Sequence, residues 1–306
     1  MVMKHIFVIN PKAGKSDKEK SIRTFLKKYD GKLDYEVYLT TCKSDGYRFV
    51  NEYLSKRPEG EKTRFYACGG DGSLHDVING VVGYKDVEVT QYATGSGNDF
   101  VKSVGGLVAF QNLAALIEGE PIPVDLIEVN GSYCINIANA GFDGEVTYEM
   151  AAFKRLPFVS GPLAYSIATF TSLLFKINQW MKVTVDGNLL YEGKALLVAM
   201  ANGHTYGGGY LCAPLAKISD GLIDVCLLKK TSRLKTAGLV KVYKAGKHLV
   251  DPKTVNIVIY KKCQETVIES KKPLAYCIDG EIFKSTRIEA HLVPNSIMFV
   301  KPKASI

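Results

Sequence analysis

Residues 69–80 read GGDGSLHDVING, and this stretch decides the fold of the first part of the chain. Gly69, Gly70 and Gly72 have no Cβ, so the backbone around Asp71 can approach a ligand closely. The residues before it, TRFYAC, have the pattern of a strand, and the residues after it have the pattern of a helix. Strand, glycine turn and helix N-terminus together predict an anion site at the carboxyl end of an α/β sheet.

Two more glycine loops follow predicted strands of the same region. They are residues 10–15, NPKAGK, and residues 94–99, TGSGND. Because the carboxyl ends of parallel strands meet at one edge of a sheet, we expect the three loops to form a single crevice. Asp71 and Asp99 supply carboxylates that suit Mg²⁺, and phosphoryl transfer needs such charge neutralisation together with a base. The chain contains neither the P-loop pattern nor the dinucleotide-binding glycine pattern.

The order of predicted elements indicates two domains. Residues 1–123 alternate strands and helices, which predicts an α/β domain with a doubly wound, mostly parallel sheet. Residues 124–291 contain many short strands and predict a β-rich, sandwich-like second domain, while residues 292–306 are a candidate to return to the first. Within these domains we expect several further elements: a helix over 107–120, one strand over 133–141, a strand over 254–260, helices over 161–180 and 232–248, and hairpin turns at 186–188 and 279–280.

Composition narrows the class of protein. The chain has 306 residues, 46% hydrophobic and 23% charged, which is ordinary for a folded protein and excludes disorder. Its net charge of +8 suits an anionic partner such as a nucleotide, an acidic membrane surface or nucleic acid. The seven cysteines are scattered without a CxxC pair, which argues against a disulfide framework or a zinc site and fits the cytoplasm. The first residues predict a strand rather than a signal peptide, and the stretch 161–175 is too short and polar to span a bilayer.

These motifs resemble those of a known family. GGDGSLHDVINGVV is similar to the GGDGT-LNE-V-NG signature of the diacylglycerol kinase catalytic domain family, which includes soluble bacterial diacylglycerol kinases, related lipid kinases and sphingosine kinases. NPKAGK, TGSGNDF, ANAGFDGEV, SDGLIDV and CIDGE resemble further family motifs in the family's order. The resemblance implies a first domain like that of phosphofructokinases and NAD kinases, a β-sandwich second domain, and ATP bound in the cleft between them.

The resemblance also implies roles for individual residues. Nucleotide contact and phosphate binding are implied for Asn10, Pro11, Lys12, Ala13, Gly14, Thr41, Gly70, Asp71, Gly72, Ser73, Leu74, His75, Asp76 and Thr94. Glu281 matches the carboxylate that serves the family as general base, Asp71 organises Mg²⁺ and phosphate, and Asp99 is a further catalytic candidate. Asp220 matches a side chain that holds a structural Mg²⁺ in some members, with the backbone carbonyls of Lys217 and Leu222.

Some residues depart from the family pattern. Ser73 replaces a threonine and keeps the hydroxyl, and Asp76 replaces a glutamate with a shorter carboxylate. His75 stands in place of an asparagine, and a lone histidine without an orienting partner favours a residue of the helix start over a catalytic group. The loop at 94–99 lacks the proline that usually precedes it in the family, so the resemblance does not define the backbone path of this loop.

The sequence therefore predicts an ATP- and Mg²⁺-dependent lipid kinase that converts diacylglycerol to phosphatidic acid. Two alternatives are an NAD kinase-like enzyme and a non-catalytic nucleotide or lipid sensor on the same fold. We expect a cytoplasmic protein that associates transiently with a membrane surface to reach its lipid, binds no nucleic acid, and is a candidate homodimer. Residues 148–180 mix apolar runs with basic residues and favour a helix over the second core, or alternatively an entry surface for acyl chains.

Overall fold

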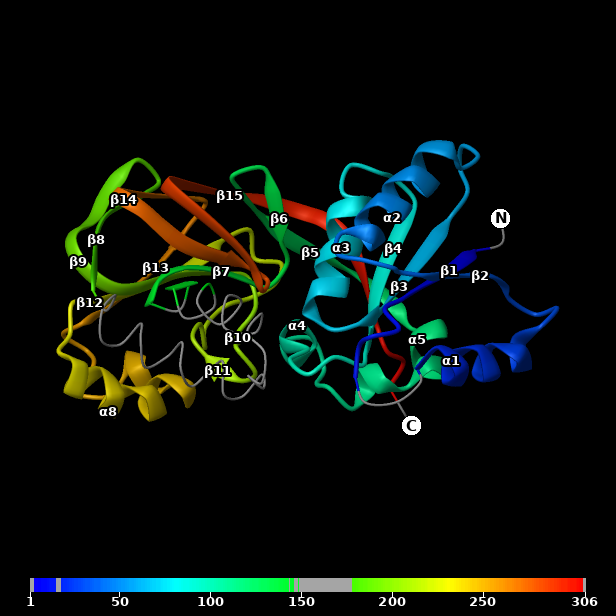
Figure 1. The fold of residues 1–306 in the computed structure, drawn as a ribbon, viewed down its shortest axis with the longest axis horizontal. Helices are drawn as coiled ribbons and strands as arrows, with labels where there is room; N and C mark the ends of the chain where they lie inside the picture. Colours follow the sequence, from blue (N-terminus) through cyan, green and yellow to red (C-terminus); the bar gives the residue numbers. More distant parts are fainter. Residues whose placement is uncertain (1–2, 15–17, 143, 146–147, 149–177, 305–306) are drawn as a thin grey trace. The chain divides into compact units, whose positions relative to one another are not determined.

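The structure is a computed structural model that describes residues 3–14, 18–142, 144–145, 148 and 178–304. The chain divides into two compact units, and each is described by itself (Figure 1). Unit 1 comprises Met1–Leu126 together with Pro294–Ile306, and unit 2 comprises Ile127–Val293. The helix expected over 161–180 lies almost entirely outside the described residues. Among the helices that are described, none has the length and apolar character needed to cross a membrane.

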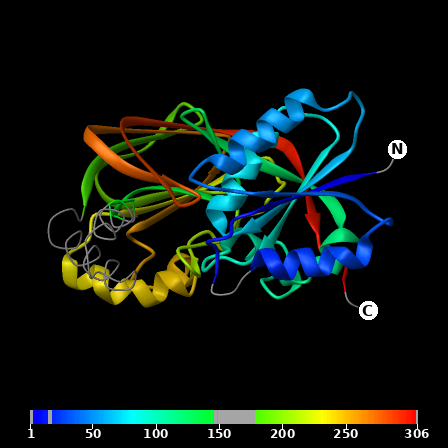
Figure 2. The ribbon, with the colours of Figure 1, turned by 45° about the vertical axis from the view of Figure 1, so that its right-hand side comes forward.

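Unit 1 is a doubly wound α/β domain, as predicted. Its sheet has the order β2-β1-β3-β4-β15, and all of these pairs are parallel. Figures 1 and 2 show α2 and α3 on one face of this sheet and α1 on the other, as right-handed crossovers require. The elements are β1 (Lys4–Ile9), α1 (Lys18–Leu26), η1 (Lys27–Tyr29), β2 (Asp34–Leu39), α2 (Asp45–Lys56), β3 (Thr63–Gly69), α3 (Asp71–Val81), β4 (Val87–Ala93), α4 (Asp99–Lys102), η2 (Ala109–Gln111), α5 (Leu113–Ile117) and the end of β15 (Glu281–Lys301).

The sheet of unit 1 is completed by the end of the chain. Met298 and Phe299 of β15 pair with Glu88 and Val89 of β4. Phe299 is fully buried, with its ring centroid 5.0 Å from that of Phe100 and 5.9 Å from that of Phe110. The last strand therefore brings its own aromatic anchor into the core of unit 1.

Unit 2 is an antiparallel β domain with the strand order β13-β12-β9-β7-β14-β15. β8 continues the position of β7, since both strands pair with β9 on one side and β14 on the other. The elements are the end of β5 (Glu120–Val129), which begins in unit 1, β6 (Ser132–Cys134), β7 (Ile137–Gly141), β8 (Gln179–Val185), β9 (Asn188–Ala201), β10 (Thr205–Tyr206), β11 (Tyr210–Leu211), β12 (Ile223–Lys229), α8 (Arg233–Lys244), η3 (Lys247–Leu249), β13 (Val258–Cys263), β14 (Glu265–Ile278) and most of β15.

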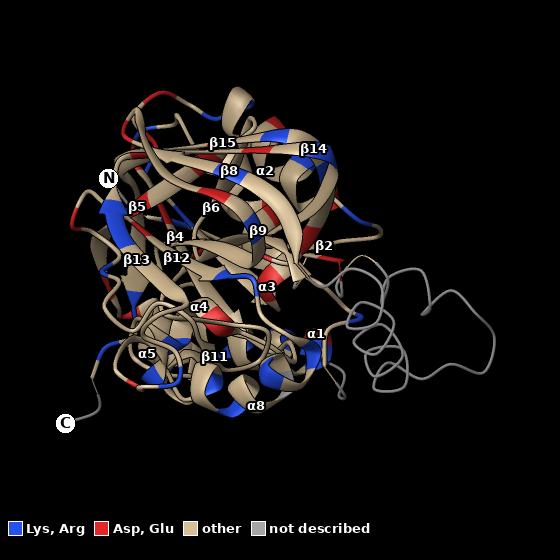
Figure 3. Cartoon of the chain, turned by 90° about the vertical axis from the view of Figure 1, so that its left-hand side faces the viewer, with Lys and Arg blue, Asp and Glu red and all other residues tan. Residues whose placement is uncertain are grey.

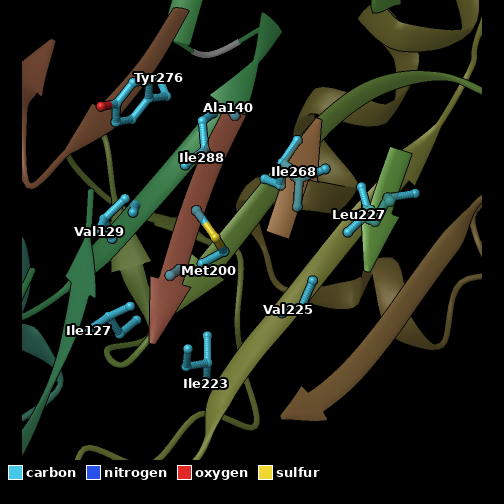
Figure 4. Packing of buried hydrophobic residues seen from close by; sticks show 14 of the residues in the cluster. Ile127, Val129, Ala140, Met200, Ile223, Val225, Leu227, Ile268, Tyr276 and Ile288 are labelled. Atoms are coloured by element: carbon cyan, nitrogen blue, oxygen red, sulfur yellow. The ribbon is translucent and has the colours of Figure 1, made fainter. Parts of the chain in front are cut away.

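Alternation along these strands builds two buried clusters. Ile223, Val225 and Leu227 of β12 point into a core that also takes side chains from β5, β7, β9, β14 and β15 (Figure 4). Cys226 and Leu228 of the same strand point to the opposite side and join a second cluster with Tyr243 of α8. Successive side chains of β12 thus pack into different clusters on its two faces, which fits the predicted sandwich-like class.

Three predicted elements were wrong in detail. The helix expected over 107–120 is divided, because Asn112 leaves the helical conformation and its side chain accepts a hydrogen bond from Ala115 N to cap α5. The strand expected over 133–141 is divided into β6 and β7. The strand expected over 254–260 begins only at Val258, since the preceding residues form turns that start at Asp251. Both predicted hairpin turns are confirmed, with positive φ at Asp186 and Asp279 and at the glycines after them.

Candidate active site

The three glycine loops of unit 1 meet at the carboxyl edge of its sheet. Asn10 follows β1 and Gly70 follows β3, and these two strands are neighbours at the point where the strand order reverses. The chain moves from β1 to β2 on one side and from β3 to β4 on the other, which opens a crevice at this edge. The loop at 94–99 follows β4, next to β3. The predicted crevice is thus present within a single unit.

Missing Cβ atoms let these loops touch. A Cβ on Gly95 would lie 2.3 Å from the Cα of Gly70, so the second and third loops are in backbone contact. Gly14 has φ +82°, and a Cβ there would lie 2.7 Å from the carbonyl oxygen of Thr94. A side chain at either position would separate the loops, which explains why glycine occupies them.

Asp71 ties two of these loops together. Its Oδ2 accepts a hydrogen bond from Asn98 N at 2.8 Å, and its Oδ1 accepts one from Asp99 N at 2.7 Å. Asp99 in turn forms an ion pair with Lys102 Nζ at 2.5 Å. Both oxygens of this carboxylate are thus held by backbone amides, and a carboxylate oxygen can accept more than one bond. Asp71 is therefore both a brace within the fold and a candidate ligand.

Asn98 organises the third loop, and sequence reasoning missed it. Its backbone is left-handed, with φ 49°. Its side chain donates to the carbonyl of Gly95 at 2.7 Å and accepts from Gly95 N and from Gln91 Nε2. Asparagine tolerates this backbone region better than most residues, and its position after two glycines was the available signal.

Thr94 and the start of α3 supply groups at the crevice that can bind phosphate oxygens. The Thr94 hydroxyl is buried and has no hydrogen-bond partner within the described part of the chain. Gly70 is the N-cap of α3 and supplies no capping side chain. Gly72 is exposed, Ser73 is half-buried, and Leu74 and His75 are buried, so only part of the predicted phosphate segment faces outward. A hydroxyl and a bare helix N-terminus are the groups that bind phosphate oxygens.

The remaining predicted nucleotide residues lie on neighbouring loops. In the first loop, the Asn10 side chain accepts from Lys12 N at 3.0 Å, and Ala13 N donates to the Asn10 carbonyl. At the end of β2, the backbone N and the hydroxyl of Thr41 donate to Asp45 Oδ2 at 2.7 and 2.9 Å. The bond from Thr41 N, offset in part by burial, holds the pKa of Asp45 below its ordinary value. Asp45 is a second residue that the sequence did not reveal.

Asp76 lies beside Gly46, at the start of α2. It is half-buried on α3, and a Cβ on Gly46 at the start of α2 would lie 3.1 Å from its Cβ. The Gly46 backbone therefore approaches α3 closely, which suits the short carboxylate at this position better than a longer one.

Glu281 lies in unit 2 as the first residue of β15. It is half-buried and pairs in register with Ile278 across the turn at Asp279 and Gly280. Asp279 fixes this turn, because its carboxylate accepts hydrogen bonds from the backbone N of residues 135, 136 and 137 at 2.8, 3.0 and 3.1 Å. Three charge-assisted bonds hold the turn, and so the backbone of Glu281, in one position. Asp279 is a positioning residue that the sequence did not identify.

Asp220, the expected metal residue, lies in a loop of unit 2 with Lys217 and Leu222. Its Oδ1 is buried and has no hydrogen-bond partner among the described residues, which fits a hard cation such as Mg²⁺. Its Oδ2 accepts from Lys262 Nζ at 2.6 Å, and the same ammonium lies 3.2 Å from Asp224 Oδ2. Where side chains are described, no cluster of three or more His, Cys, Asp or Glu residues could hold a metal ion. A cation here would therefore depend on Asp220 and on the carbonyl oxygens of the loop.

Asp224 is a fully buried neighbour of this site. Its Oδ1 accepts from the Tyr260 hydroxyl at 2.8 Å. Burial raises the pKa of Asp224, although the hydrogen bond from Tyr260 and the charge of Lys262 oppose the rise. Lys262 is the counter-ion shared by the buried Asp224 and the half-buried Asp220.

Comparison with known proteins now defines the class. The family model for the diacylglycerol kinase catalytic domain matches residues 4–129. The model for the YegS C-terminal NAD kinase beta sandwich-like domain matches residues 136–301. These matches, on this fold, identify a lipid kinase. The chain belongs to the family of diacylglycerol kinases and YegS-like lipid kinases.

Individual relatives can be aligned with this chain over two thirds or more of their length. The chain is 26% identical to a diacylglycerol kinase of Bacillus subtilis (strain 168) over 90% of this chain and 88% of the relative. It is 28% identical to a probable lipid kinase YegS-like of Shewanella frigidimarina over 87% of this chain and 84% of the relative. It is 30% identical to a diacylglycerol kinase of Staphylococcus aureus over 70% of this chain and 67% of the relative.

Solved structures show the same fold. A putative diacylglycerol kinase from Bacillus anthracis has a TM-score of 0.76 at 22% identity, with 99% of this chain and 98% of that chain covered. A yeast NADH kinase complexed with NADH has a TM-score of 0.53 at 10% identity, covering 100% of this chain and 84% of that chain. The predicted fold class, an α/β domain similar in fold to that of NAD kinases followed by a β-sandwich-like domain, is confirmed.

Proposed function

We propose that this lipid kinase transfers the γ-phosphoryl group of ATP to the free hydroxyl of diacylglycerol and so forms phosphatidic acid. The observation that carries the proposal is the convergence of three glycine loops around a buried Thr94 hydroxyl that lacks a hydrogen-bond partner among the described residues. Relatives named diacylglycerol kinase match up to 90% of the chain, which supports the choice of lipid.

In this proposal the loops of unit 1 hold the triphosphate. Backbone N–H groups at the start of α3 and the Thr94 hydroxyl bind phosphate oxygens, and Lys12 offsets part of their charge. When bound, Mg²⁺ neutralises the phosphate charge, and Asp71 and Asp99 are the residues that would hold it at these loops, while Asp220 would hold a structural ion. The brace between Asp71 and the amides of Asn98 and Asp99 keeps that carboxylate oriented before any ligand binds.

Glu281 is proposed as the general base. It accepts the proton of the lipid hydroxyl as the hydroxyl oxygen forms its bond to the γ-phosphorus and the bond to the β–γ bridging oxygen breaks, releasing ADP. Asp279 contributes by fixing the turn that carries Glu281. We also propose that the enzyme acts at a membrane surface, where its substrate resides, that it binds no nucleic acid, and that it forms a homodimer.

The test uses purified protein, radiolabelled ATP and separate lipids: diacylglycerol, phosphatidylglycerol, a sphingoid base and a polyprenol, with NAD as a further acceptor. We expect label in phosphatidic acid and a loss of turnover of roughly a hundredfold or more for Glu281→Gln, as for other general bases. Label in another lipid would replace the substrate, and label in NAD would support an NAD kinase-like enzyme. Binding of ATP without transfer to any acceptor would support a sensor.

A further inference from the structure

A strongly basic stretch surrounds α8 in unit 2. Residues 229–250 contain seven lysine and arginine side chains and no aspartate or glutamate. Figure 3 shows Lys and Arg along α8. These basic side chains are Lys229, Lys230, Arg233, Lys235, Lys241, Lys244 and Lys247. We call residues 229–250 the α8 basic segment.

The inner side of α8 is fixed to its unit. Thr236, Leu239 and Tyr243 are buried at helical spacing. The Tyr243 hydroxyl lies 3.5 Å from that of Tyr206 on β10, and the Ser232 side chain caps the helix by accepting from Lys235 N at 3.3 Å. The opposite side of α8 is therefore presented on a stable support.

The outer side of α8 combines apolar and basic side chains. Leu234 is 89% exposed, although leucine is among the residues that are most often buried. With about 100° between successive residues of a helix, Leu234 and Lys241 lie on the side opposite Tyr243. Val240 is 41% exposed on the flank, and Val250, just beyond the helix, is 79% exposed. Arg233 and Leu234 also line an open depression at the N-terminal end of the helix.

The charges of this surface are available to an external partner. Among the described residues, Lys235, Lys241 and Lys247 are exposed and take part in no salt bridge, in contrast to Lys56, Lys182 and Lys262. A basic helix with an outward leucine fits a lipid surface, where the apolar side chain enters the headgroup region and the ammonium groups contact anionic headgroups. Nucleic acid fits less well, because the only aromatic residue of α8, Tyr243, is buried and cannot stack on bases.

We propose that the α8 basic segment is the surface through which this kinase docks on a bilayer of anionic lipids. The proposal rests on the proposed function, since a kinase of membrane lipids must reach its substrate at the bilayer. It adds the surface that makes the contact and the charge of the lipids that recruit it. Each lysine close to an anionic surface strengthens binding by about fivefold, so two or three of them and one inserted leucine give a reversible association.

The test measures sedimentation with vesicles of phosphatidylcholine, with and without phosphatidylglycerol, in the absence of ATP and diacylglycerol. The wild type should bind only the anionic vesicles, and binding should weaken as salt rises. The double variant Lys235→Glu/Lys241→Glu should bind at least about twentyfold more weakly. Leu234→Ser should bind several-fold more weakly and keep the salt dependence.

A matched pair provides the control. Lys62→Glu/Lys272→Glu changes the net charge equally at exposed lysines outside the α8 basic segment and should bind like the wild type. Equal loss in both pairs, or unchanged binding in the α8 pair, overturns the proposal. Loss of DNA binding without loss of vesicle binding in the α8 pair also overturns it. Because the assay needs no turnover, a wild type that binds anionic vesicles but phosphorylates no lipid would refute the proposed function and leave the docking surface standing.

Discussion

At the scale of single residues, Asp71 combines two tasks that are usually assigned to different side chains. Its two oxygens accept the amides of Asn98 and Asp99, and it is also the candidate carboxylate for phosphate and metal. An aspartate in a glycine loop is therefore no proof of a ligand role by itself, because closing the loop also requires it.

Replacement of Asp71 by asparagine separates these tasks. In Asp71→Asn, the new side-chain NH₂ group would face a backbone N–H that needs an acceptor, so we expect a loss of stability of about 1–3 kcal/mol. Thermal unfolding measures this loss. Asp34→Asn is the matched control, since Asp34 is 56% exposed and pairs only at the surface with Lys4. It should change the stability by less than about 1 kcal/mol. An unchanged unfolding temperature for Asp71→Asn would show that the brace does not contribute to stability.

His5 makes the stability of the fold depend on pH. Burial, with a smaller contribution from Arg64, lowers the pKa of His5 from 6.5 to about 4. The unfolded chain therefore binds a proton at a higher pH than the folded chain does, and stability falls as the pH drops from about 6.5 toward 4. We expect His5→Gln to flatten the pH dependence of the unfolding free energy in this window. Denaturant unfolding at several pH values measures it, and equal slopes for both proteins would contradict the assignment.

At the scale of elements, the sequence predicted strands and helices where local pattern and burial agree. Every residue of β3 is buried, and the apolar run at residues 65–68 within it was recognisable. The helix expected over 107–120 failed because apolar periodicity continued across Asn112, which acts as a cap instead. The division between β6 and β7 depends on Asp279, a residue more than 140 positions away, and no local pattern records that contact.

The candidate site divides in the same way. The glycine loops were predictable because the residue type itself, glycine without a Cβ, indicates backbone that can approach a phosphate. Asn98, Asp45 and Asp279 were not, because each acts on backbone groups that only the folded chain brings near. Positioning residues of this kind need the structure.

The two Asp-Gly turns allow a matched experiment. Asp186 braces its hairpin by accepting from the backbone N of residues 264 and 265, as Asp279 does from residues 135–137. Asp186→Ala and Asp279→Ala should both lower the unfolding temperature, since each leaves backbone N–H groups without an acceptor. Only Asp279→Ala should also lower kcat, because Asp279 fixes the turn that carries Glu281 and Asp186 does not. We expect a loss of about tenfold or more, as for a displaced general base. Equal kcat values for the two variants would contradict the positioning role.

At the scale of the whole molecule, the strand β15 belongs to both units, and its last residues anchor unit 1. Phe299→Ala removes a buried ring that contacts Phe100 and Phe110, and should cost about 3–5 kcal/mol. Met298→Ala, at the adjacent and 39% exposed position, is the control and should cost much less. Denaturant unfolding followed by circular dichroism compares the two. Similar losses would mean that the end of the chain is not a core element of unit 1.

This return of the chain has a consequence for its synthesis on the ribosome. The hydrogen bond from the Thr90 hydroxyl to the Val300 carbonyl joins residues 210 positions apart. At typical elongation rates of about 5–20 residues per second, the nascent first unit waits on the order of ten seconds or longer for its fifth strand. Until then β4 is an open edge that other chains can pair with. We expect a nascent chain stalled before residue 294 to be cleaved by protease within residues 1–126, and released full-length protein to resist.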